Sequence, residues 1–457
     1  MHTQETQERK IATIDSIFLG IGGTSPALSI AAAAAALLST AGNLAPASIL
    51  YSGLMIFGIT LSFIHLNKLK VDDGASFTWV TEIFGKALGF LSGWAVLVAS
   101  VIYLVSAAPP AATGILSVIN PAFAENKTLI TILGVAILSL INFIVLRGLR
   151  FASKIETFVT SLSLVTMLSI IIAAAYHLFV FKSGTLPEFP FLISSFTRES
   201  FVSSTLIALF FFWGWDVAMN VGEETSTANN GITKSVSAVM IVVAALTMLS
   251  MMAIYSTLSP EQIAASGTNV VFDVANMLFP KPLGTIAVVT ILLSSIGAIE
   301  ASILQFIKTL FSMSRAGALH KRYQKIYAKW NSPWLAILII WSVSTALFIF
   351  SVHSHSAAYV VKAAINATVL QVAFYYSMTG FACAWHYRKS LWNVRDLLLK
   401  ILWPLISALF LVSVSLYSIN TLDKTTIAIG FGGLFLGIIP FIINLINNQR
   451  ITNKHLA

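Results

Sequence analysis

Long apolar segments separated by short polar ones run through most of the chain. A stretch of about 20 residues without Lys, Arg, Asp or Glu is long enough for a helix to cross a bilayer. The first such stretch, residues 16–67, has room for two helices joined by a turn at 40–46. Ten further spans are predicted at 86–125, 128–146, 157–181, 201–225, 235–258, 283–312, 333–352, 363–387, 401–422 and 425–448. The pattern predicts an all-α polytopic membrane protein with twelve transmembrane helices.

Two segments refine this division. Pro109, Pro110 and Pro121 are expected to mark the far end of the third span, since proline interrupts helical hydrogen bonding. Residues 259–282 mix apolar and polar side chains, which predicts an interfacial helix between the seventh and eighth spans.

Composition and charge support the same class. Of the 457 residues, 57% are hydrophobic and 10% charged, which excludes an ordinary soluble domain. With the N-terminus placed in the cytoplasm, 21 of the 27 basic residues fall on the cytoplasmic side, as the positive-inside rule requires. This distribution accounts for the net charge of +9 without nucleic acid as a partner. We therefore expect a cell-membrane protein with cytoplasmic tails at 1–11 and 450–457. The single cysteine, Cys383, excludes an intrachain disulfide.

Glycine and proline interrupt two of the spans. The first contains Gly20-Ile21-Gly22-Gly23-Thr24-Ser25-Pro26, and the sixth contains Gly214 within a run of aromatic residues. The two spans stand five apart, so they cross the membrane in opposite directions. Discontinuous first helices in two inverted five-helix repeats produce this arrangement. The repeats would occupy residues 12–181 and 201–388, followed by two C-terminal helices at 398–449.

Broken helices expose backbone groups that an amino acid can use. Amides freed at Ile21, Gly22 and Gly23 would suit a substrate carboxylate, because a helix N-terminus carries partial positive charge. Carbonyls freed near Phe210, Phe211 and Trp213 would accept from a substrate ammonium group. The alternative is that the glycines only allow close helix packing.

Two acids lie inside predicted spans. Asp216 is expected to exchange a proton during transport, or to pair with a cationic substrate. Its structural alternative is an anchor between helices. Glu300, near the middle of the eighth span, is a second candidate proton site with a similar structural alternative. Glu223 and Glu224 close the sixth span and are expected either to pair with basic residues as gate contacts or to be solvated.

Other motifs carry weaker expectations. Phe212, Trp213 and Trp215 would occlude a ligand or contact an amine by cation–π interaction, unless they only pack or face lipid. Small-residue pairs occur at Gly89 and Gly93, expected to pack within the bundle, and at Gly433 and Gly437, for which a homodimer contact is one reading. No histidine or cysteine spacing suggests a metal, and no cofactor motif or catalytic constellation is present.

Four motifs together resemble the amino acid–polyamine–organocation (APC) family of secondary transporters. They are Gly20-Ile21-Gly22-Gly23, Gly74-Ala75-Ser76-Phe77-Thr78-Trp79-Val80, Phe212-Trp213-Gly214-Trp215-Asp216 with Gly222-Glu223-Glu224, and Ser312-Met313-Ser314-Arg315-Ala316-Gly317-Ala318-Leu319. They stand in the family's order and cover most of the first eight spans.

The resemblance implies a LeuT-type inverted-repeat fold and alternating access. It also implies that Phe18, Phe210 and Trp213 offer carbonyls to a substrate amine, and that Asp216 is linked to substrate or proton. The full expected substrate site is Phe18, Ile21, Gly22, Gly23, Thr24, Phe210, Phe211, Trp213, Gly214 and Trp215.

Energy coupling is left open by one departure from the family. Some proton-driven relatives carry a lysine midway along the fifth helix, where sodium-driven relatives bind an ion; Ser163 stands there, as a candidate cation ligand. The expected function is proton-linked transport of amino acids or related amines. The alternatives are a polyamine or amino-acid exchanger, a sodium symporter, and, outside this class, a channel or a membrane enzyme.

Overall fold

The fold is a bundle of helices in every part that the structure, a computed structural model, describes: residues 13–180, 188–224, 230–327, 329–330, 332–354, 357–390, 393–420 and 422–446. Within these ranges the β-structure is one isolated bridge between Tyr327 and Ser332. The predicted all-α class is therefore confirmed. The expected tails at 1–11 and 450–457, and the last residues of the fifth, sixth and twelfth expected spans, lie outside the described residues.

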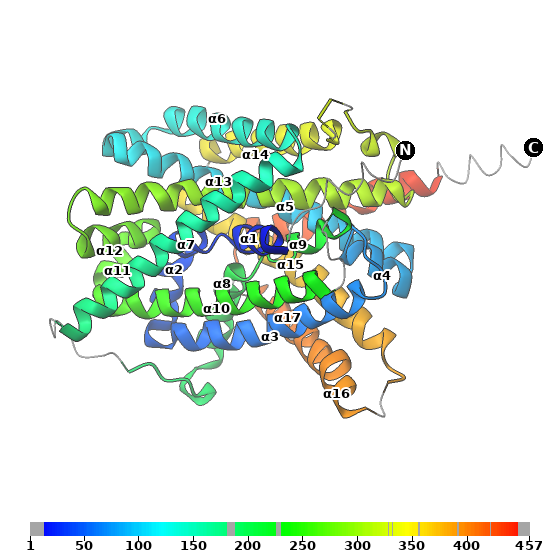
Figure 1. Ribbon diagram of the computed structural model, residues 1–457, viewed down its shortest axis with the longest axis horizontal. Coiled ribbons are helices and arrows are strands. Elements are labelled where there is room, and N and C mark those ends of the chain that lie inside the picture. Colours follow the sequence, from blue (N-terminus) through cyan, green and yellow to red (C-terminus); the bar gives the residue numbers. More distant parts are fainter. Residues whose placement is uncertain are drawn as a thin grey trace, which may run out of the picture.

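Most of the longer helices run roughly parallel or antiparallel to one another (Figure 1). In chain order they are α1 (Thr13–Thr24), α2 (Pro26–Ala41), α3 (Ala45–Asn67), α4 (Ser76–Phe84), α5 (Lys86–Ile119), α6 (Lys127–Leu146), α7 (Leu149–Val180), α8 (Arg198–Phe211), α9 (Val217–Asn220), α10 (Asn230–Thr257), α11 (Pro260–Ser266), α12 (Val270–Leu278), α13 (Leu283–Arg315), α14 (Trp334–Ser354), α15 (Ala357–His386), α16 (Val394–Asp396), α17 (Trp403–Ser418) and α18 (Lys424–Leu436).

Nine segments of the described chain are long and apolar enough to cross a membrane. One of them, residues 13–67, holds α1, α2 and α3, with a 3-10 turn at Gly42–Leu44 where the sequence predicts a turn. The sixth expected span is not among the nine, because it divides into the 14-residue α8 and the short α9. The chain is thus a multi-pass membrane protein, and the count of twelve spans stays a prediction.

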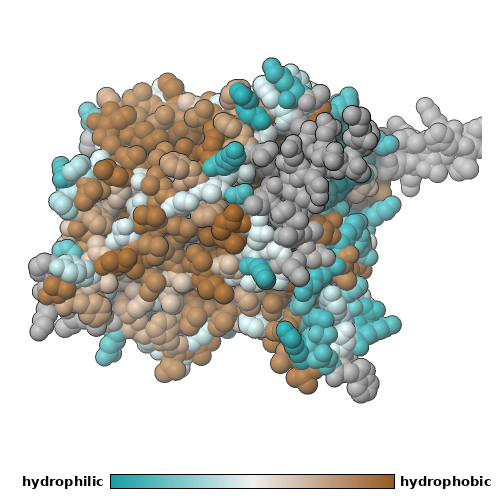
Figure 2. All heavy atoms as spheres, viewed as in Figure 1, coloured by the Kyte–Doolittle hydropathy of each residue, from teal (hydrophilic) through white to brown (hydrophobic). Residues whose placement is uncertain are grey.

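The outer surface has the character that lipid contact requires. Figure 2 shows apolar side chains over the left and central parts of one face and polar ones concentrated toward the right end. Large apolar side chains such as Phe158 and Phe350 are 68% and 70% exposed. Water would make so much exposed apolar surface unfavourable, whereas acyl chains solvate it.

Two helix boundaries differ from the prediction. α5 continues through Pro109 and Pro110 to Ile119, because proline has a helical φ and its cost is confined to lost hydrogen bonds and a local clash. The hydroxyl of Thr113 donates to the Pro109 carbonyl at 2.9 Å. α7 begins eight residues before the predicted start at 157, so Glu156 lies inside it.

The glycine pairs both pack within the chain. A Cβ at Gly89 would lie 1.9 Å from the Thr81 side chain, and a Cβ at Gly93 would lie 2.8 Å from that of Met313. These close contacts confirm the expected packing within the bundle. A Cβ at Gly433 or Gly437 would likewise meet side chains of α5, and Trp94 donates to the Gly433 carbonyl at 2.9 Å. The dimer reading of the second pair is therefore wrong for the faces that these glycines present.

The helices α1 and α13 occupy the centre of the bundle. α1 packs against α7, α10 and α13, and α13 also packs against α5 and α7. In Figure 1 α1 lies in the middle of the view, with α9, against which it packs, beside it. Both predicted helix breaks are therefore surrounded by other helices rather than by lipid.

Candidate functional site

The first break lies at Ser25, between α1 and α2. Ser25 has φ 39° and ψ 67°, a left-handed conformation that ends α1. Pro26 opens α2 and disfavours helical geometry in the residue before it. The Ser25 hydroxyl donates to the Ser294 carbonyl of α13 at 3.1 Å. A break in the first span is therefore confirmed, but it falls after the glycines.

This position corrects which backbone groups are freed. Ile21, Gly22 and Gly23 lie in the last turns of α1, where amides donate to carbonyls four residues earlier. The Phe18 carbonyl is likewise inside α1, nearly two turns before the break. The amides without an intrahelical acceptor are instead those of Ala27 and Leu28, at the start of α2.

The second break spans Phe212 to Asp216, between α8 and α9. Gly214 has φ 101°, a value that residues with a side chain rarely adopt. The predicted break at Gly214 is confirmed. The Phe210 carbonyl accepts from the Trp213 amide at 3.3 Å, so the turn already uses part of the acceptor capacity expected there.

The two breaks touch each other through their glycines. A Cβ on Gly23 would lie 2.2 Å from the Gly214 carbonyl oxygen, and a Cβ on Gly214 would lie 2.2 Å from that of Gly23. Thr24, beside Gly23, is 1% exposed and donates to the Ile21 carbonyl at 2.8 Å. Residues about 190 positions apart thus bring two backbone interruptions together at the centre of the bundle.

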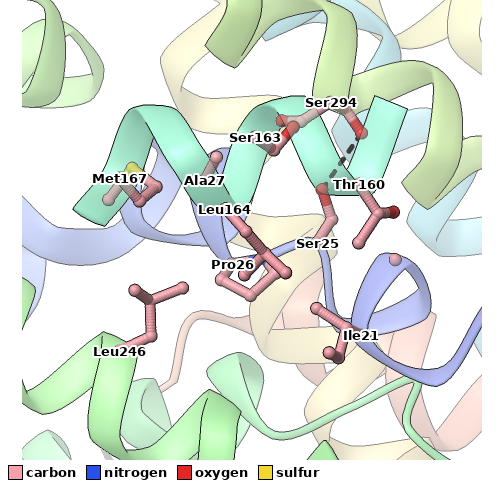
Figure 3. Close-up of a pocket in the computed structure, with 11 residues that line it drawn as sticks. Ile21, Ser25, Pro26, Ala27, Thr160, Ser163, Leu164, Met167, Leu246 and Ser294 are labelled. Carbon is pink, nitrogen blue, oxygen red and sulfur yellow. Dashed lines mark hydrogen bonds between the residues drawn. The ribbon is translucent and has the colours of Figure 1, made fainter. Parts of the chain in front are cut away.

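A small cavity adjoins the first break. Ser25, Thr160, Ser163 and Ser294 line it together with Gly22 and several apolar side chains (Figure 3). Its volume is about 10 Å³, near the lower limit for a single water molecule. The Ser163 hydroxyl donates to the Val159 carbonyl at 2.8 Å, which leaves its oxygen able to accept.

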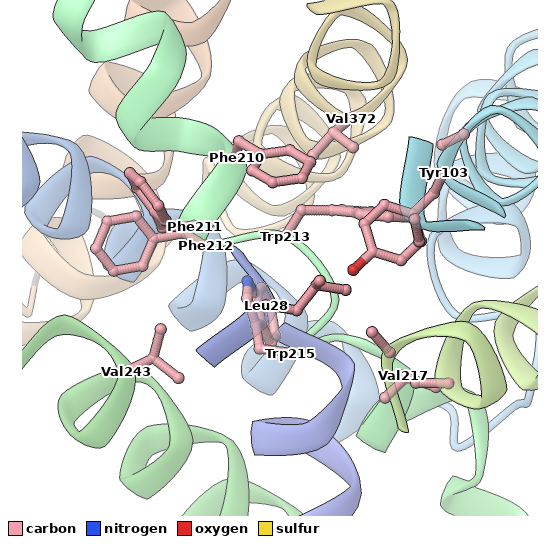
Figure 4. Close-up of a cluster of buried hydrophobic side chains, with 14 of the residues drawn as sticks. Leu28, Tyr103, Phe210, Phe211, Phe212, Trp213, Trp215, Val217, Val243 and Val372 are labelled. Atoms are coloured by element: carbon pink, nitrogen blue, oxygen red, sulfur yellow. The ribbon is translucent and has the colours of Figure 1, made fainter. Parts of the chain in front are cut away.

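The aromatic residues of the sixth span divide into two groups. Phe210 and Trp213 lie near Tyr103 of α5 and Leu28 at the start of α2 (Figure 4). The Trp213 and Tyr103 ring centroids are 4.8 Å apart. Trp215 instead packs between Phe63 and Tyr376, at centroid distances of 5.0 and 5.8 Å. Trp213 therefore stands beside the breaks, and Trp215 is a packing residue.

Asp216 joins three helices. It is 2% exposed, and its Oδ2 accepts from the Tyr375 hydroxyl at 2.8 Å and from Gln305 Nε2 at 2.7 Å. Its Oδ1 accepts from the Tyr376 hydroxyl at 3.1 Å. Tyr375 in turn accepts from Trp213 Nε1 at 2.9 Å. This carboxylate fixes the start of α9 to α13 and α15.

Glu300 has a different environment. It is fully buried in α13, and neither carboxylate oxygen has a hydrogen-bond partner among the residues that the structure describes. Glu156 of α7 is also fully buried and lies within electrostatic range of it. Thr160 donates to Glu156 Oε1 at 2.8 Å, whereas Oε2 has no partner. Of the two predicted proton candidates, Asp216 therefore accepts three hydrogen bonds, whereas Glu300 accepts none from the described residues.

Residues 11–446 match the sequence pattern of the protein family described as "Amino acid permease". The chain belongs to this family. Membership confirms the resemblance to APC transporters and identifies transport, rather than catalysis, as the activity class of its members.

Three curated relatives are similar to parts of the permease. The serine/threonine exchanger SteT of Bacillus subtilis (strain 168) is 24% identical over 63% of this chain and 64% of its own length. The human cystine/glutamate transporter is 22% identical over 65% of this chain and 59% of its own. The human Asc-type amino acid transporter 1 is 24% identical over 61% of this chain and 54% of its own length. The match thus covers less than two thirds of each relative.

A charge network lies at the C-terminal end of α13; it consists of Asp72, Asp73, Glu223, Lys308 and Arg315. Arg315 donates to Glu223 Oε2 at 2.9 Å and to Asp72 Oδ2 at 3.0 Å. Lys308 pairs with Asp73 at 2.9 Å. The network ties the α3–α4 loop to α13 and to the segment after α9. The expected pairing of Glu223 with a basic residue is confirmed, and the Glu224 side chain lies outside the described residues.

Hydrogen bonds hold Asp72 and Glu223 of the charge network in their ionised form. The guanidinium of Arg315 lowers the pKa of Glu223 below its usual 4.5. Burial acts to raise the pKa of Asp72, but donation by Ser312, Gly74 and Thr78 outweighs it and holds that pKa below 3.8. Because both values are lowered, Asp72 and Glu223 are ionised at neutral pH, and their ion pairs with Arg315 weaken only as the pH falls through these pKa values.

Removal of Arg315 should loosen this end of the permease. We expect Arg315→Gln to raise, by several-fold, the rate at which a cysteine reporter at buried Val221 reacts with a polar thiol reagent, in a Cys383→Ala background. Lys70→Gln removes an ion pair whose side chains are 47% and 46% exposed, and should leave the rate unchanged. Equal labelling of the two variants would contradict a closing role, and so would opening of the parent protein at mildly acidic pH.

Sequence reasoning missed several of these residues. The charge-free stretch that defines the fifth expected span begins one residue after Glu156, so the sequence pattern leaves this acid outside the membrane. Gln305, Tyr375 and Tyr376 carry no motif, and only the fold brings them to Asp216. The available signal for Glu156 is an acid directly before a long apolar run; in the structure it lies about two turns inside α7.

Proposed function

We propose that the permease carries amino acids or related organic amines across the cell membrane by alternating access. The substrate binds between the α1–α2 break and the α8–α9 break. The observation that carries this proposal is the backbone contact between Gly23 and Gly214, which holds two interrupted helices side by side. A channel would not need two such interruptions around a closed centre.

Each end of an amino acid has backbone partners at the breaks. The amides of Ala27 and Leu28 start α2 and suit the carboxylate. The carbonyls near Phe211 and Trp213, and those that end α1, suit the ammonium group. Trp213 and Phe210 would cover the side chain of the substrate. The cavity at the breaks is smaller than an amino acid, so binding must accompany a movement of these helices.

The wider architecture belongs to the same proposal. Twelve spans, in two inverted repeats at 12–181 and 201–388 with two further helices, would place both chain termini in the cytoplasm. The opposite directions of the first and sixth spans and the basic residues on one side support this arrangement.

Coupling to protons is the favoured energy source. Of the two acids proposed for it, Glu300 has unpartnered oxygens, whereas three donors engage Asp216. A carboxylate that no donor stabilises is the better proton acceptor. Sodium binding at Ser163 and plain exchange remain alternatives; the name of SteT, an exchanger, favours the latter.

Counterflow in liposomes tests the substrate class. Protein reconstituted with unlabelled internal amino acid should accumulate the same labelled amino acid from outside, and excess external amino acids should compete. Polyamines, which lack a carboxylate, should not compete. Accumulation of polyamines would contradict the carboxylate site at the start of α2, and accumulation of neither amino acids nor amines would contradict the transport proposal.

A further inference from the structure

Glu156 and Glu300 form a buried acid pair at the junction of α1, α7 and α13. The Glu156 carboxylate is wedged between glycines of two other helices. A Cβ on Gly22 of α1 would lie 1.4 Å from its Oε1, and a Cβ on Gly297 of α13 would lie 2.4 Å from its Oε2. Glu300 follows Gly297 by slightly less than one turn on the same helix, which places it near the Glu156 carboxylate and within electrostatic range of it.

The acid pair has little to stabilise two negative charges. Within the described part of the chain, three of its four oxygens lack a hydrogen-bond partner, and both residues are 0% exposed. An unpaired charge away from water is unfavourable, and a second one beside it adds repulsion. A neutralising species is therefore required for this closed arrangement.

No basic side chain supplies that charge among the described residues. The titratable group that faces the pair from α5 is the phenol of Tyr103, which does not carry positive charge. α2 has no ionisable residue, and the other charged groups of the surrounding helices lie toward their ends or are engaged elsewhere. They are Asp15 on α1, Lys86 on α5, Arg150, Lys154 and His177 on α7, Lys234 on α10, Asp273 on α12, Lys308 and Arg315 on α13, which pair with acids of the charge network, and Asp216 before α9.

The space at the junction favours a proton over a metal ion. Calcium takes about 6–8 oxygen ligands, and even a small ion needs room among its ligands. The adjoining cavity holds at most one water, and a single hydroxyl, that of Thr160, bonds to the pair. A proton needs no cavity, because it sits on one oxygen and is shared with the next.

We propose that Glu156 and Glu300 together hold the transported proton of this permease. One carboxyl carries the hydrogen and donates it to the other carboxylate, so the pair binds one proton and loses one unit of negative charge. On release the proton passes to water on the side that has opened, and both groups ionise. The proposal rests on the proposed transport function and replaces Asp216 as the coupling acid.

The position of the pair links the proton to the substrate site. Glu156 touches α1 at Gly22, three residues before the break at Ser25. Movement of α1 away from α7 and α13 would admit water to the carboxylates and allow them to ionise. The packed arrangement favours the protonated pair, so proton binding and closure of the break stabilise each other.

Transport assays test this coupling with Glu156→Gln and Glu300→Gln. An inward proton gradient should stimulate uptake by the parent protein several-fold, and each variant should lose that stimulation while it still performs counterflow at equal pH. Glu199→Gln, at an exposed acid of α8, should keep it. Stimulation that survives in both variants would overturn the proposal. So would stimulation by a sodium gradient that both variants lose.

Infrared spectroscopy tests the pair without transport. The purified protein should show the carbonyl-stretch band of a protonated carboxylic acid at neutral pH, which Glu156→Gln/Glu300→Gln removes and Glu199→Gln retains. A spectrum that the double variant leaves unchanged would overturn the proposal. If no amino acid is exchanged by the parent protein but the band behaves as expected, the substrate assignment fails and the proton site stands.

Discussion

Gly214→Ala should abolish transport and lower the thermal stability of the purified protein. At φ 101° a residue with a side chain costs about 1–3 kcal/mol in backbone strain alone. The new Cβ would also lie 2.2 Å from the Gly23 carbonyl oxygen, a distance that forces the two breaks apart. Neither α1 nor α9 can yield easily, because other helices surround both. Uptake at matched expression and thermal unfolding in detergent measure the two effects.

Variants of two other glycines distinguish the effect of backbone strain at Gly214 from the effect of its close contact with Gly23. Gly267 has φ 53°, and a Cβ added there would meet nothing within 4 Å, so Gly267→Ala tests backbone strain alone. Gly432 lies in α18 and also faces open space, so Gly432→Ala should be neutral. We expect the loss to be greatest for Gly214→Ala. If Gly214→Ala were as stable and active as Gly267→Ala, the close approach of the breaks would be wrong.

Asp216→Ala should be the second severe change. It removes the acceptor of Tyr375, Tyr376 and Gln305, all fully or almost fully buried. Each buried donor left without an acceptor costs about 1–3 kcal/mol. We expect a fall in thermal stability of the purified protein and little folded protein in the membrane, measured by fluorescence-detected size-exclusion chromatography.

Asp216→Asn distinguishes an anchor from a proton carrier. The amide oxygen can accept from Tyr375 and Gln305, and the amide nitrogen can donate to a rotated Tyr376 hydroxyl. This variant should therefore stay folded and keep its response to a proton gradient. A folded Asp216→Asn protein that loses this response would identify Asp216, rather than the acid pair, as the coupling group.

The helix breaks could be predicted because they follow from local chemistry. Gly214 and Pro26 impose their backbone effects whatever surrounds them. Within the predicted segment 20–26 the break falls at Ser25 rather than at the glycines, because three glycines weaken a helix without ending it, whereas a residue before proline leaves helical geometry readily. In the structure Gly22 and Gly23 serve close contact with Glu156 and Gly214, which is the packing role that the glycine pattern left as the alternative.

The partners of the buried acids could not be predicted in the same way. Gln305 and Tyr375 are 89 and 159 residues from Asp216, and no periodicity relates them. Glu156 lies in the first turns of α7, and a span defined by the absence of charged residues begins only after it. Which acid is satisfied and which is not depends on contacts between helices, so the division of roles between Asp216 and Glu300 needed the fold.

A cryo-electron microscopy map of the protein in lipid nanodiscs, with the amino acid that it exchanges, tests the central claim most directly. The account predicts interrupted first and sixth spans, with ligand density between Ser25–Leu28 and Phe211–Gly214 and its carboxylate against the first amides of α2. Ligand density elsewhere in the bundle, or two uninterrupted helices at these positions, would contradict it.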